Sequence, residues 1–281
     1  MIRRILVTGA SGAIGRAVVA RLRGEGIDAV SASRRGSDRV FDVTDPKAIE
    51  SIVDELRPRA VIHLAGALPG SDTALLTAVN VGGTEAVARA CARAGARLVS
   101  ASSAAVYGTG NSRASSEGDV LAPANPYGES KARAEDRIDA LSADLTALSV
   151  RIFNVTGAEF PSSLPMRLLR STPDSPVRVR NPHGFVRDYI RLPDVVEALV
   201  AAATAAAPDG HTRVNVGSGV AMTSSRLVEV LSTTRALHVE TVLGADDRVW
   251  ADTRRARSVL GFVPSPLEPH WFGDVLNHES R

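Results

Sequence analysis

Short apolar runs alternate with longer stretches of helical spacing along the first half of the chain. The apolar runs that read as buried strands cover residues 4–8, 29–33, 60–64, 97–101 and 146–152. Helical spacing covers residues 12–23, 46–56 and 74–94, and a further helix begins near Pro126. Asp45 is suited to cap the second helix, with Pro46 at its first position. This alternation predicts an α/β fold with a doubly wound parallel (Rossmann) sheet and helices on both faces.

The pattern changes after about Asn154, where apolar runs shorten and strands and helices no longer alternate cleanly. Prolines also become frequent, at positions 161, 165, 173, 176 and 182. We therefore predict a dinucleotide-binding domain over residues 1–153 and mainly a smaller C-terminal substrate-binding lobe over residues 154–281. Segments near residues 187–217 are expected to return to the main sheet, with a strand at residues 213–216.

The amino-acid composition is typical of a globular protein and argues against several classes of function. Hydrophobic residues make up 44% of the 281 residues, as in ordinary globular proteins. The 33 Lys and Arg against 31 Asp and Glu are scattered along the chain, which argues against nucleic-acid binding. Cys91 is the only cysteine, so no internal disulfide can form. We see no signal peptide, and the Ala-rich residues 198–207 are too short to span a membrane, so the expected location is the cytoplasm.

A glycine-rich loop joins the first strand to the first helix. Gly9, Gly12 and Gly15 would permit a tight turn and a close approach of the backbone to a pyrophosphate. The helix N-terminus would add unpaired N–H groups and a favourable dipole. The alternative, a turn that only packs helix on strand, has less support because the loop has the required strand–loop–helix context.

The end of the second strand bears on the choice of cofactor. An acid at this position binds the ribose of NAD, but the residues here are Ser33, Arg34 and Arg35. Asp28 precedes the strand rather than following it. Two arginines and a serine can hold the 2′-phosphate of NADP through charge-assisted hydrogen bonds. The sequence therefore favours NADP, with NAD possible and with solvated loop arginines as the alternative interpretation.

Tyr127 and Lys131 are spaced to lie one turn apart on a helix face. A lysine ammonium near a tyrosine stabilises the phenolate and moves its pKa toward neutral pH, as acid–base catalysis requires. Ser102 and Ser103 end the strand that begins at residue 97. A hydroxyl there could bond to the substrate oxygen that gains or loses the proton.

With these motifs the chain resembles an extended short-chain dehydrogenase/reductase of the NAD-dependent epimerase/dehydratase family, whose members include UDP-glucose 4-epimerases. The resemblance covers nearly the whole chain, from the glycine loop to Trp250–Ala251–Asp252. It also includes Asn215–Val–Gly–Ser–Gly219 and the segment that begins at Arg187.

The resemblance implies a role for each matching residue. Tyr127 would be the general acid/base, Lys131 would lower its pKa and hold the nicotinamide ribose, and Ser103 would bond to the reacting oxygen. Substrate residues would be Ser103, Asn154 and Arg187. The residues implied or indicated for cofactor binding are Gly9, Ser11, Gly12, Ala13, Ile14, Gly15, Ser33, Arg34, Arg35, Asp42, Val43, Leu64, Ala65, Gly66, Asn80, Ala101, Ser102, Tyr127, Lys131 and Phe153.

Two departures from the family pattern concern the substrate. The family's second phosphate-binding arginine is missing, because its position aligns near Val242. The segment between Asn154 and Arg187 is also shorter than in full-length epimerases. The Thr-Asp-Glu of sugar 4,6-dehydratases is absent after Ser102, so dehydration is not expected. The six histidines lack metal-ligand spacing, so no metal site is expected.

Three functions remain open at this stage. The first is an NADP(H)-dependent oxidoreductase that reduces a keto group of a sugar-like substrate, which we expect to be nucleotide-linked. The second is an NAD-dependent nucleotide-sugar 4-epimerase, which would use the same residues. The third is a dinucleotide-binding sensor without catalysis. The resemblance also implies a homodimer built through the helices near residues 74–94 and 127–140.

Overall fold

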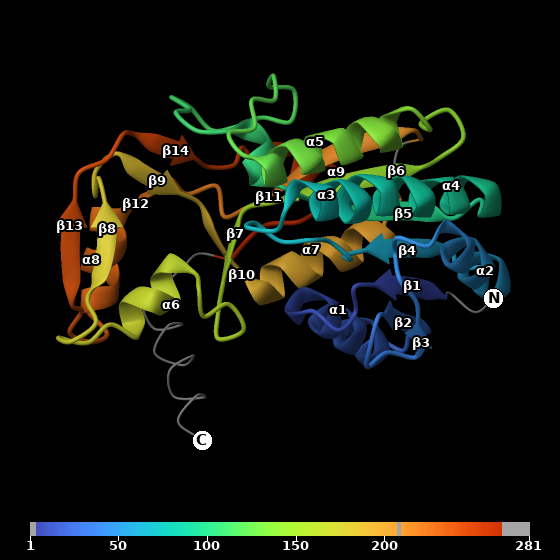
Figure 1. The fold of residues 1–281 in the computed structure, drawn as a ribbon, viewed down its shortest axis with the longest axis horizontal. Helices are drawn as coiled ribbons and strands as arrows, with labels where there is room; N and C mark the ends of the chain where they lie inside the picture. The colour runs from blue at the N-terminus through green and yellow to red at the C-terminus, as the bar shows by residue number, and fades with distance from the viewer. Residues whose placement is uncertain (1–3, 207–208, 266–281) are drawn as a thin grey trace.

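The computed structural model describes residues 4–206 and 209–265. Its main sheet has seven strands, all parallel, in the order β11-β6-β5-β4-β1-β2-β3 (Figure 1). The chain leaves β1 in both directions across the sheet, which confirms the predicted doubly wound Rossmann fold. The strands are β1 (Ile5–Thr8), β2 (Ala29–Ser33), β3 (Arg39–Val40), β4 (Ala60–His63), β5 (Arg97–Ser103), β6 (Ala147–Ile152) and β11 (His211–Val216).

Helices cover both faces of this sheet because side chains alternate along each strand. Ile5 and Val7 pack into one core cluster, and Leu6 packs into the other. The first cluster also takes side chains from α1 (Ala13–Gly24), α7 (Leu192–Thr204) and α9 (Arg254–Leu260). The second takes them from α2 (Pro46–Leu56), α4 (Thr84–Ala94) and α5 (Pro126–Asp139). As predicted, the Asp45 carboxylate caps α2 by accepting from the backbone N–H groups of Lys47 and Ala48.

The helix predicted over residues 74–94 is not α-helical throughout. It consists of α3 (Thr73–Leu76), a π-helical segment (Thr77–Gly83) and α4. A Cβ on Gly83 would lie 2.9 Å from Val43 Cγ2, so the glycine lets this segment pack closely on the loop before α2. π-Helical turns are rare in proteins, and those that occur often lie at functional sites. This one buries Asn80 completely.

Most of the remaining described residues form a smaller lobe at the carboxyl ends of the main strands (Figure 1). β7 (Asn154–Thr156) pairs with β10 (Tyr189–Arg191) between the lobe and the main sheet, and β11 then returns to the main sheet beside β6. The boundary at residues 153 and 154 stays a prediction. In the described residues no helix is long and apolar enough to cross a membrane. The lobe's elements are α6 (Leu164–Leu169), β8 (Val177–Arg180), β9 (Phe185–Arg187), β12 (Met222–Thr223), α8 (Ser224–Ser232), β13 (Val239–Val242) and β14 (Asp247–Val249).

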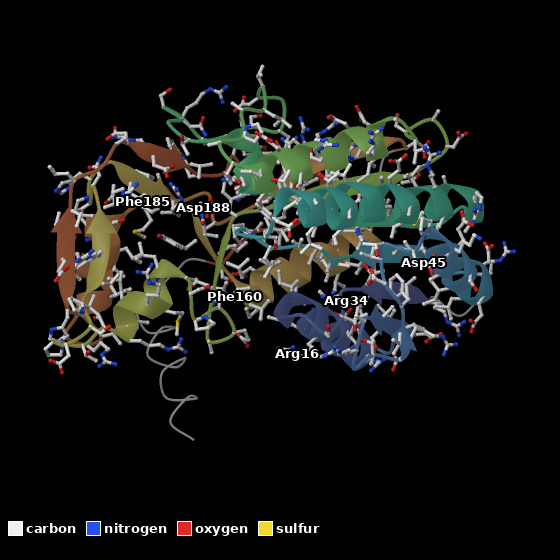
Figure 2. The ribbon with its side chains drawn as sticks, in the orientation of Figure 1. Arg16, Arg34, Asp45, Phe160, Phe185 and Asp188 are labelled. Carbon is white, nitrogen blue, oxygen red and sulfur yellow. The ribbon has the colours of Figure 1, made fainter. Side chains whose placement is uncertain are left out.

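The buried carboxylate of Asp188 fastens the lobe to the main sheet. It lies between β9 and β10 (Figure 2) and accepts hydrogen bonds from Ser218 N and Oγ, both at 2.6 Å. Gly219 N at 2.8 Å and Ala251 N at 3.1 Å donate to its other oxygen. A Cβ on Gly217 would lie 2.6 Å from that oxygen. The position therefore needs glycine for close packing.

We expect Gly217→Ala to lower the free energy of unfolding by about 1–3 kcal/mol, because the added methyl displaces the Asp188 carboxylate or Ala251. Urea denaturation measures this change. Gly118→Ala is the matched control, since nothing lies within 4 Å of a Cβ there, and it should change stability by less than about 0.5 kcal/mol. Equal stability of the two variants would contradict the close packing at Gly217.

Candidate active site

The glycine loop lies where strand order reverses. β1 has β2 on one side and β4 on the other, so the loops after β1 and β4 diverge at the carboxyl edge of the sheet. Gly9 has φ +69°, and a Cβ on it would lie 2.5 Å from Ala65 N. A Cβ on Gly15 would lie 2.4 Å from Gly9 O. No side chain caps α1, so its first N–H groups face the loop. This cradle fits a dinucleotide pyrophosphate, and Gly9, Ser11, Gly12, Ala13, Ile14 and Gly15 all belong to it.

The end of β2 is basic. The exposed side chains of Arg34 and Arg35 form no ion pair with any described residue. Ser33 Oγ donates to the carbonyl of Arg35 at 2.6 Å and lies 2.6 Å from Ser37 Oγ, which holds this turn in place. The nearest following acid, Asp38, accepts from Ser31 N at 2.8 Å and pairs with Arg23. The Asp38 carboxylate is therefore engaged with the strand.

Asp42 and Val43 follow β3. The Asp42 carboxylate accepts from Thr44 N at 2.9 Å and Thr44 Oγ1 at 2.8 Å, and these bonds lower its pKa. Val43 is buried against Gly83. The carboxylate thus stabilises the turn into α2, while the backbone of both residues forms the loop beyond the sheet edge.

Asn80 ties the loop after β4 to α5. Its Oδ1 accepts from Ala67 N at 2.8 Å, and its Nδ2 donates to Ser130 Oγ at 2.9 Å. A Cβ on Gly66 would meet Asn80 Oδ1 at 3.2 Å and Lys131 Nζ at 3.5 Å. Gly66 thus lies beside Asn80 and Lys131, whereas Leu64 and Ala65 lie against Gly9 of the glycine loop.

The beginning of α5 presents Tyr127 and Lys131 toward the end of β5. Asn125 caps the helix by accepting from Gly128 N at 2.9 Å, and Pro126 takes the first position. A Cβ on Gly128 would lie 2.5 Å from Ala105 O, so the missing side chain lets α5 approach the strand end. Lys131 Nζ donates to Ala101 O at 2.9 Å and lies 6.0 Å from the centre of the Tyr127 ring.

Burial controls the protonation of this pair. Burial lowers the pKa of Lys131 to about 8, and the charge of Glu135 opposes this shift. Burial raises the pKa of Tyr127, and a hydrogen bond with the Ser103 hydroxyl opposes this shift. The sequence predicts a lowered Tyr127 pKa, whereas burial in the structure raises it. The reason is that the half-buried phenol loses hydration while the Lys131 ammonium is directed at a backbone carbonyl.

Ser103 and Ser102 point in different directions at the end of β5. Ser103 Oγ accepts from Ala105 N at 3.2 Å and also bonds with Tyr127. Ser102 Oγ instead donates to the buried Glu135 at 2.6 Å. Ser103 is therefore the serine of the Tyr-Lys-Ser group, and the Ser102 side chain is engaged inside the protein.

His63 is a buried structural residue. Its Nδ1 lies 2.7 Å from Thr8 Oγ1 and its Nε2 lies 3.3 Å from Thr84 Oγ1. Burial, with the charge of Lys131, lowers its pKa to about 3. His63 is therefore neutral and joins β1, β4 and α4 rather than exchanging protons with a ligand.

Asn154 and Arg187, predicted to contact substrate, and Phe153, predicted to contact the cofactor, lie near the junction with the lobe. The Phe153 ring is buried and stacks with Tyr107 at a centroid distance of 6.2 Å. Asn154 Nδ2 donates to the Asp188 carbonyl at 3.0 Å. The Arg187 guanidinium lies 3.9 Å from the centre of the Phe185 ring and forms a 2.6 Å ion pair with Asp247. Arg187 is thus partly neutralised by a carboxylate that the sequence motifs do not indicate.

A second group of side chains has the arrangement of a hydrolytic triad. Ser149 Oγ lies 2.8 Å from His211 Nε2, and His211 Nδ1 lies 3.0 Å from Asp139. Ser149 is completely buried in β6, so its hydroxyl cannot reach a substrate. The group ties β11 and β6 to α5. Within residues 4–206 and 209–265 no group of three His, Cys, Asp or Glu could hold a metal ion.

Sequence reasoning missed two carboxylates that hold predicted residues, Glu135 and Asp247, and it gave Asp188 a structural role without naming its partners. Only Glu135 had a local signal, because it follows Lys131 by four positions and Tyr127 by eight on the same helix. Asp188 and Asp247 meet their partners through tertiary contacts, for which the sequence has no periodic pattern.

Comparison with known proteins agrees with this geometry. Residues 5–217 match the NAD dependent epimerase/dehydratase family. The dTDP-6-deoxy-L-talose 4-dehydrogenase (NAD(P)(+)) of Kitasatospora kifunensis is 30% identical over 293 residues, which cover 93% of this chain and 91% of that one. UDP-glucose 4-epimerase of Mycolicibacterium smegmatis is 30% identical over 305 residues, 93% of each chain. The solved structure of MoeE5 in complex with UDP-glucose and NAD has a TM-score of 0.85, 30% identity and 99% coverage of both chains. The chain is therefore an enzyme of the extended short-chain dehydrogenase/reductase type, and it belongs to the NAD dependent epimerase/dehydratase family.

Proposed function

We propose that this enzyme reduces a keto group of a nucleotide-linked sugar with NADPH. The choice of NADPH rests on the basic side chains at the end of β2. Arg34 and Arg35 are exposed without an ion pair among the described residues, and the nearby Asp38 carboxylate is engaged with Ser31 and Arg23. A 2′-phosphate would be stabilised there by charge-assisted hydrogen bonds. The ribose hydroxyl of NAD would lack the usual acidic partner.

The described residues fit such a cofactor along one continuous edge. The glycine loop would hold the pyrophosphate, and Ser33, Arg34 and Arg35 would hold the 2′-phosphate. Asp42 and Val43 would lie near the adenine, while residues 64–66 and Asn80 would line the path to the nicotinamide. The backbone of Ala101 and Phe153 would close the far end of the site. When bound, NADPH supplies the hydride that adds to the carbonyl carbon.

Three side chains would handle the proton and the developing charge. Tyr127 gives its hydroxyl proton to the carbonyl oxygen as the carbon is reduced, so the C=O bond becomes CH–OH and Tyr127 is left as the phenolate. Ser103 donates a hydrogen bond to the same oxygen. The Lys131 ammonium stabilises the phenolate until a proton from solvent restores it.

The relatives support a nucleotide-sugar substrate. The dehydrogenase at 30% identity is named for a dTDP-linked deoxysugar, and the MoeE5 structure contains UDP-glucose. A 4-dehydrogenase forms a 4-keto sugar, so we infer a 4-keto-6-deoxyhexose nucleotide as the substrate class. Arg187 would contact a substrate phosphate, and Asn154 would lie beside the sugar. We further propose a homodimer located in the cytoplasm.

NAD-dependent 4-epimerisation is the second candidate. Its support is the equally long match to a UDP-glucose 4-epimerase and the NAD bound in MoeE5. An epimerase would retain its cofactor and would interconvert sugars without net oxidation. Two assays of the purified protein separate the two functions. Net loss of NADPH absorbance with a dTDP-4-keto-6-deoxyhexose supports reduction. Interconversion of UDP-hexoses by protein with bound NAD supports epimerisation.

Tyr127→Phe is expected to lower kcat by about 10²–10⁴-fold, because the phenyl ring keeps its packing but has no proton to donate. NADPH affinity should stay within about twofold, since no hydrogen bond from the hydroxyl to the cofactor phosphates is involved. Steady-state kinetics and fluorescence titration measure the two quantities. Unchanged turnover in this variant would instead favour a non-catalytic, cofactor-sensing protein.

Arg34→Ala is expected to weaken NADPH binding by about tenfold or more, because a charge-assisted hydrogen bond to the 2′-phosphate is lost. NADH binding should change little. Arg59→Ala removes the same charge from an exposed position just before β4, at the opposite edge of the sheet, and should leave both affinities unchanged. Tighter binding of NADH than NADPH by the wild-type protein would contradict the proposed selectivity.

Reductive turnover should decline as the pH rises through about 8. The pKa of Lys131 is lowered to about 8, so above this pH the lysine loses the charge that stabilises the phenolate. Tyr127, whose pKa is raised, keeps its proton over this range. The pH dependence of kcat with saturating NADPH tests this. A constant kcat up to pH 10 would show that the Lys131 charge is not required.

A further inference from the structure

The face of α5 that carries Tyr127 and Lys131 continues with a third functional group. Glu135 lies one turn beyond Lys131 and is 2% exposed. An isolated carboxylate in such a place would be strongly destabilising unless its oxygens were fully bonded. Its oxygens accept from Ser102 Oγ at 2.6 Å, Arg151 Nε at 3.0 Å, Arg151 Nη2 at 2.6 Å and Arg213 Nε at 3.2 Å.

The partner of Glu135 is as deeply buried. Arg151, on β6, is 1% exposed and meets the carboxylate with two parallel N–H···O bonds. Its remaining Nη1 donates to Tyr107 Oη at 2.9 Å and to the Glu117 carbonyl at 3.3 Å. Tyr107 Oη in turn donates to Asn215 Oδ1 at 2.6 Å. Complete bonding of this kind offsets the cost of burying an ion pair and fixes one geometry for it.

This network lies beside two of the three proposed catalytic side chains, Ser103 and Lys131. Ser102 is the immediate neighbour of Ser103 on β5, and its hydroxyl is bound to Glu135. Lys131 is bound to the Ala101 carbonyl on the same strand. Glu135 and Lys131 therefore attach α5 to Ser102 and Ala101, the two residues of β5 that come directly before Ser103. A shift of Glu135 would change the distance between Tyr127 and Ser103.

The charges around Lys131 explain why the carboxylate matters. Glu135 is the carboxylate whose charge opposes the loss of the Lys131 proton. From β4, His63 is neutral, because its pKa is lowered to about 3. Tyr127 on α5 is neutral at this pH because its pKa is raised.

The groups that face Glu135 itself are mainly cations, Arg151 from β6 and Arg213 from β11. Asp139 on α5 pairs with Arg213 at 3.2 Å. Burial acts to raise the pKa of Glu135, but the bonds and charge of Arg151 outweigh it and the pKa is lowered. Glu135 therefore stays ionised at neutral pH. Without it, Lys131 would share the interior with the uncompensated guanidinium of Arg151, whereas Arg213 would keep its ion pair with Asp139.

We propose that Glu135 is a positioning residue that aligns Tyr127 and Lys131 with Ser103 and keeps Lys131 protonated at the working pH. This inference rests on the proposed roles of those three residues. Glu135 does not touch the substrate. It acts through Lys131 on the same helix and through Ser102 on β5.

The small number of lysines in the chain simplifies an NMR titration of Lys131. All but two of its 33 basic residues are arginine, and the two lysines are Lys47 and Lys131. A protein labelled with ¹³C-lysine therefore gives two Cε signals, with the exposed Lys47 as an internal reference. We expect Glu135→Gln to move the Lys131 midpoint down by about one pH unit, because an opposite charge nearby is lost. The Lys47 midpoint should not move.

The kinetic readout should follow the same direction. In Glu135→Gln the alkaline limit of kcat is expected to move to lower pH with Lys131, whereas Glu135→Asp, which keeps the charge, should restore most of the wild-type midpoint. Asp136→Asn removes an exposed carboxylate from the next position of α5 and should change neither. An unchanged Lys131 midpoint in Glu135→Gln would overturn the proposal whatever the activity. Since the titration needs no substrate, a protein inactive on nucleotide sugars would count against the proposed function alone.

A paired variant guards against loss of folding. Glu135→Gln leaves Arg151 buried without its partner, which can cost several kcal/mol. Glu135→Gln with Arg151→Met removes both charges together and is expected to fold. Its kcat should be at least tenfold lower than wild type at every pH, with NADPH affinity unchanged, because Ser102 and α5 lose their common anchor. Turnover within twofold of wild type would show that the network is only structural.

Discussion

The hydrogen bond from Lys131 Nζ to the Ala101 carbonyl joins the two elements on which the candidate chemistry depends. An ammonium group is costly to bury, so it has to be paired or bonded wherever it is held. Here the carbonyl of β5 and the charge of Glu135 share that task, and the lysine keeps a pKa of about 8. Because α5 begins only one turn earlier, the same bond sets where Tyr127 stands relative to Ser103.

The parallel sheet accounts for the position of everything else in the site. All seven strands end at one edge, so the glycine loop, the basic turn after β2, the loop over Asn80 and Ser103 lie along it. Buried polar contacts centred on the Asp188 carboxylate join the lobe to that edge, beside an apolar cluster that contains Val249, Tyr107 and Phe153. Arg187 is the last residue of β9 and directly precedes Asp188, which connects the proposed phosphate contact to the position of the lobe.

Local patterns in the sequence were sufficient to predict much of the fold and of the candidate site. The strand–helix alternation, the Asp45 cap and the spacing of Tyr127 and Lys131 depend on residues within a few positions of one another. The π-helical stretch around Asn80 could not be foreseen, because its periodicity differs little from that of an α-helix over seven residues. Nor could the bonds of Asp188 to residues 218, 219 and 251, or of Arg187 to Asp247, since they join segments separated by 30 to 63 positions. The direction of the Tyr127 pKa was wrong at the sequence level for the same reason, because burial is a tertiary property.

The proposed function as a reductase is tested most directly by tracing the transferred hydride with a deuterium label, rather than by measuring a reaction rate. The protein would be incubated with NADPH deuterated at the transferable position of nicotinamide C4 and a dTDP-4-keto-6-deoxyhexose, and the product examined by NMR and mass spectrometry. The account predicts one deuterium on the former carbonyl carbon for each NADPH oxidised. Deuterium that stays on the cofactor while the sugar is interconverted without net oxidation would contradict it.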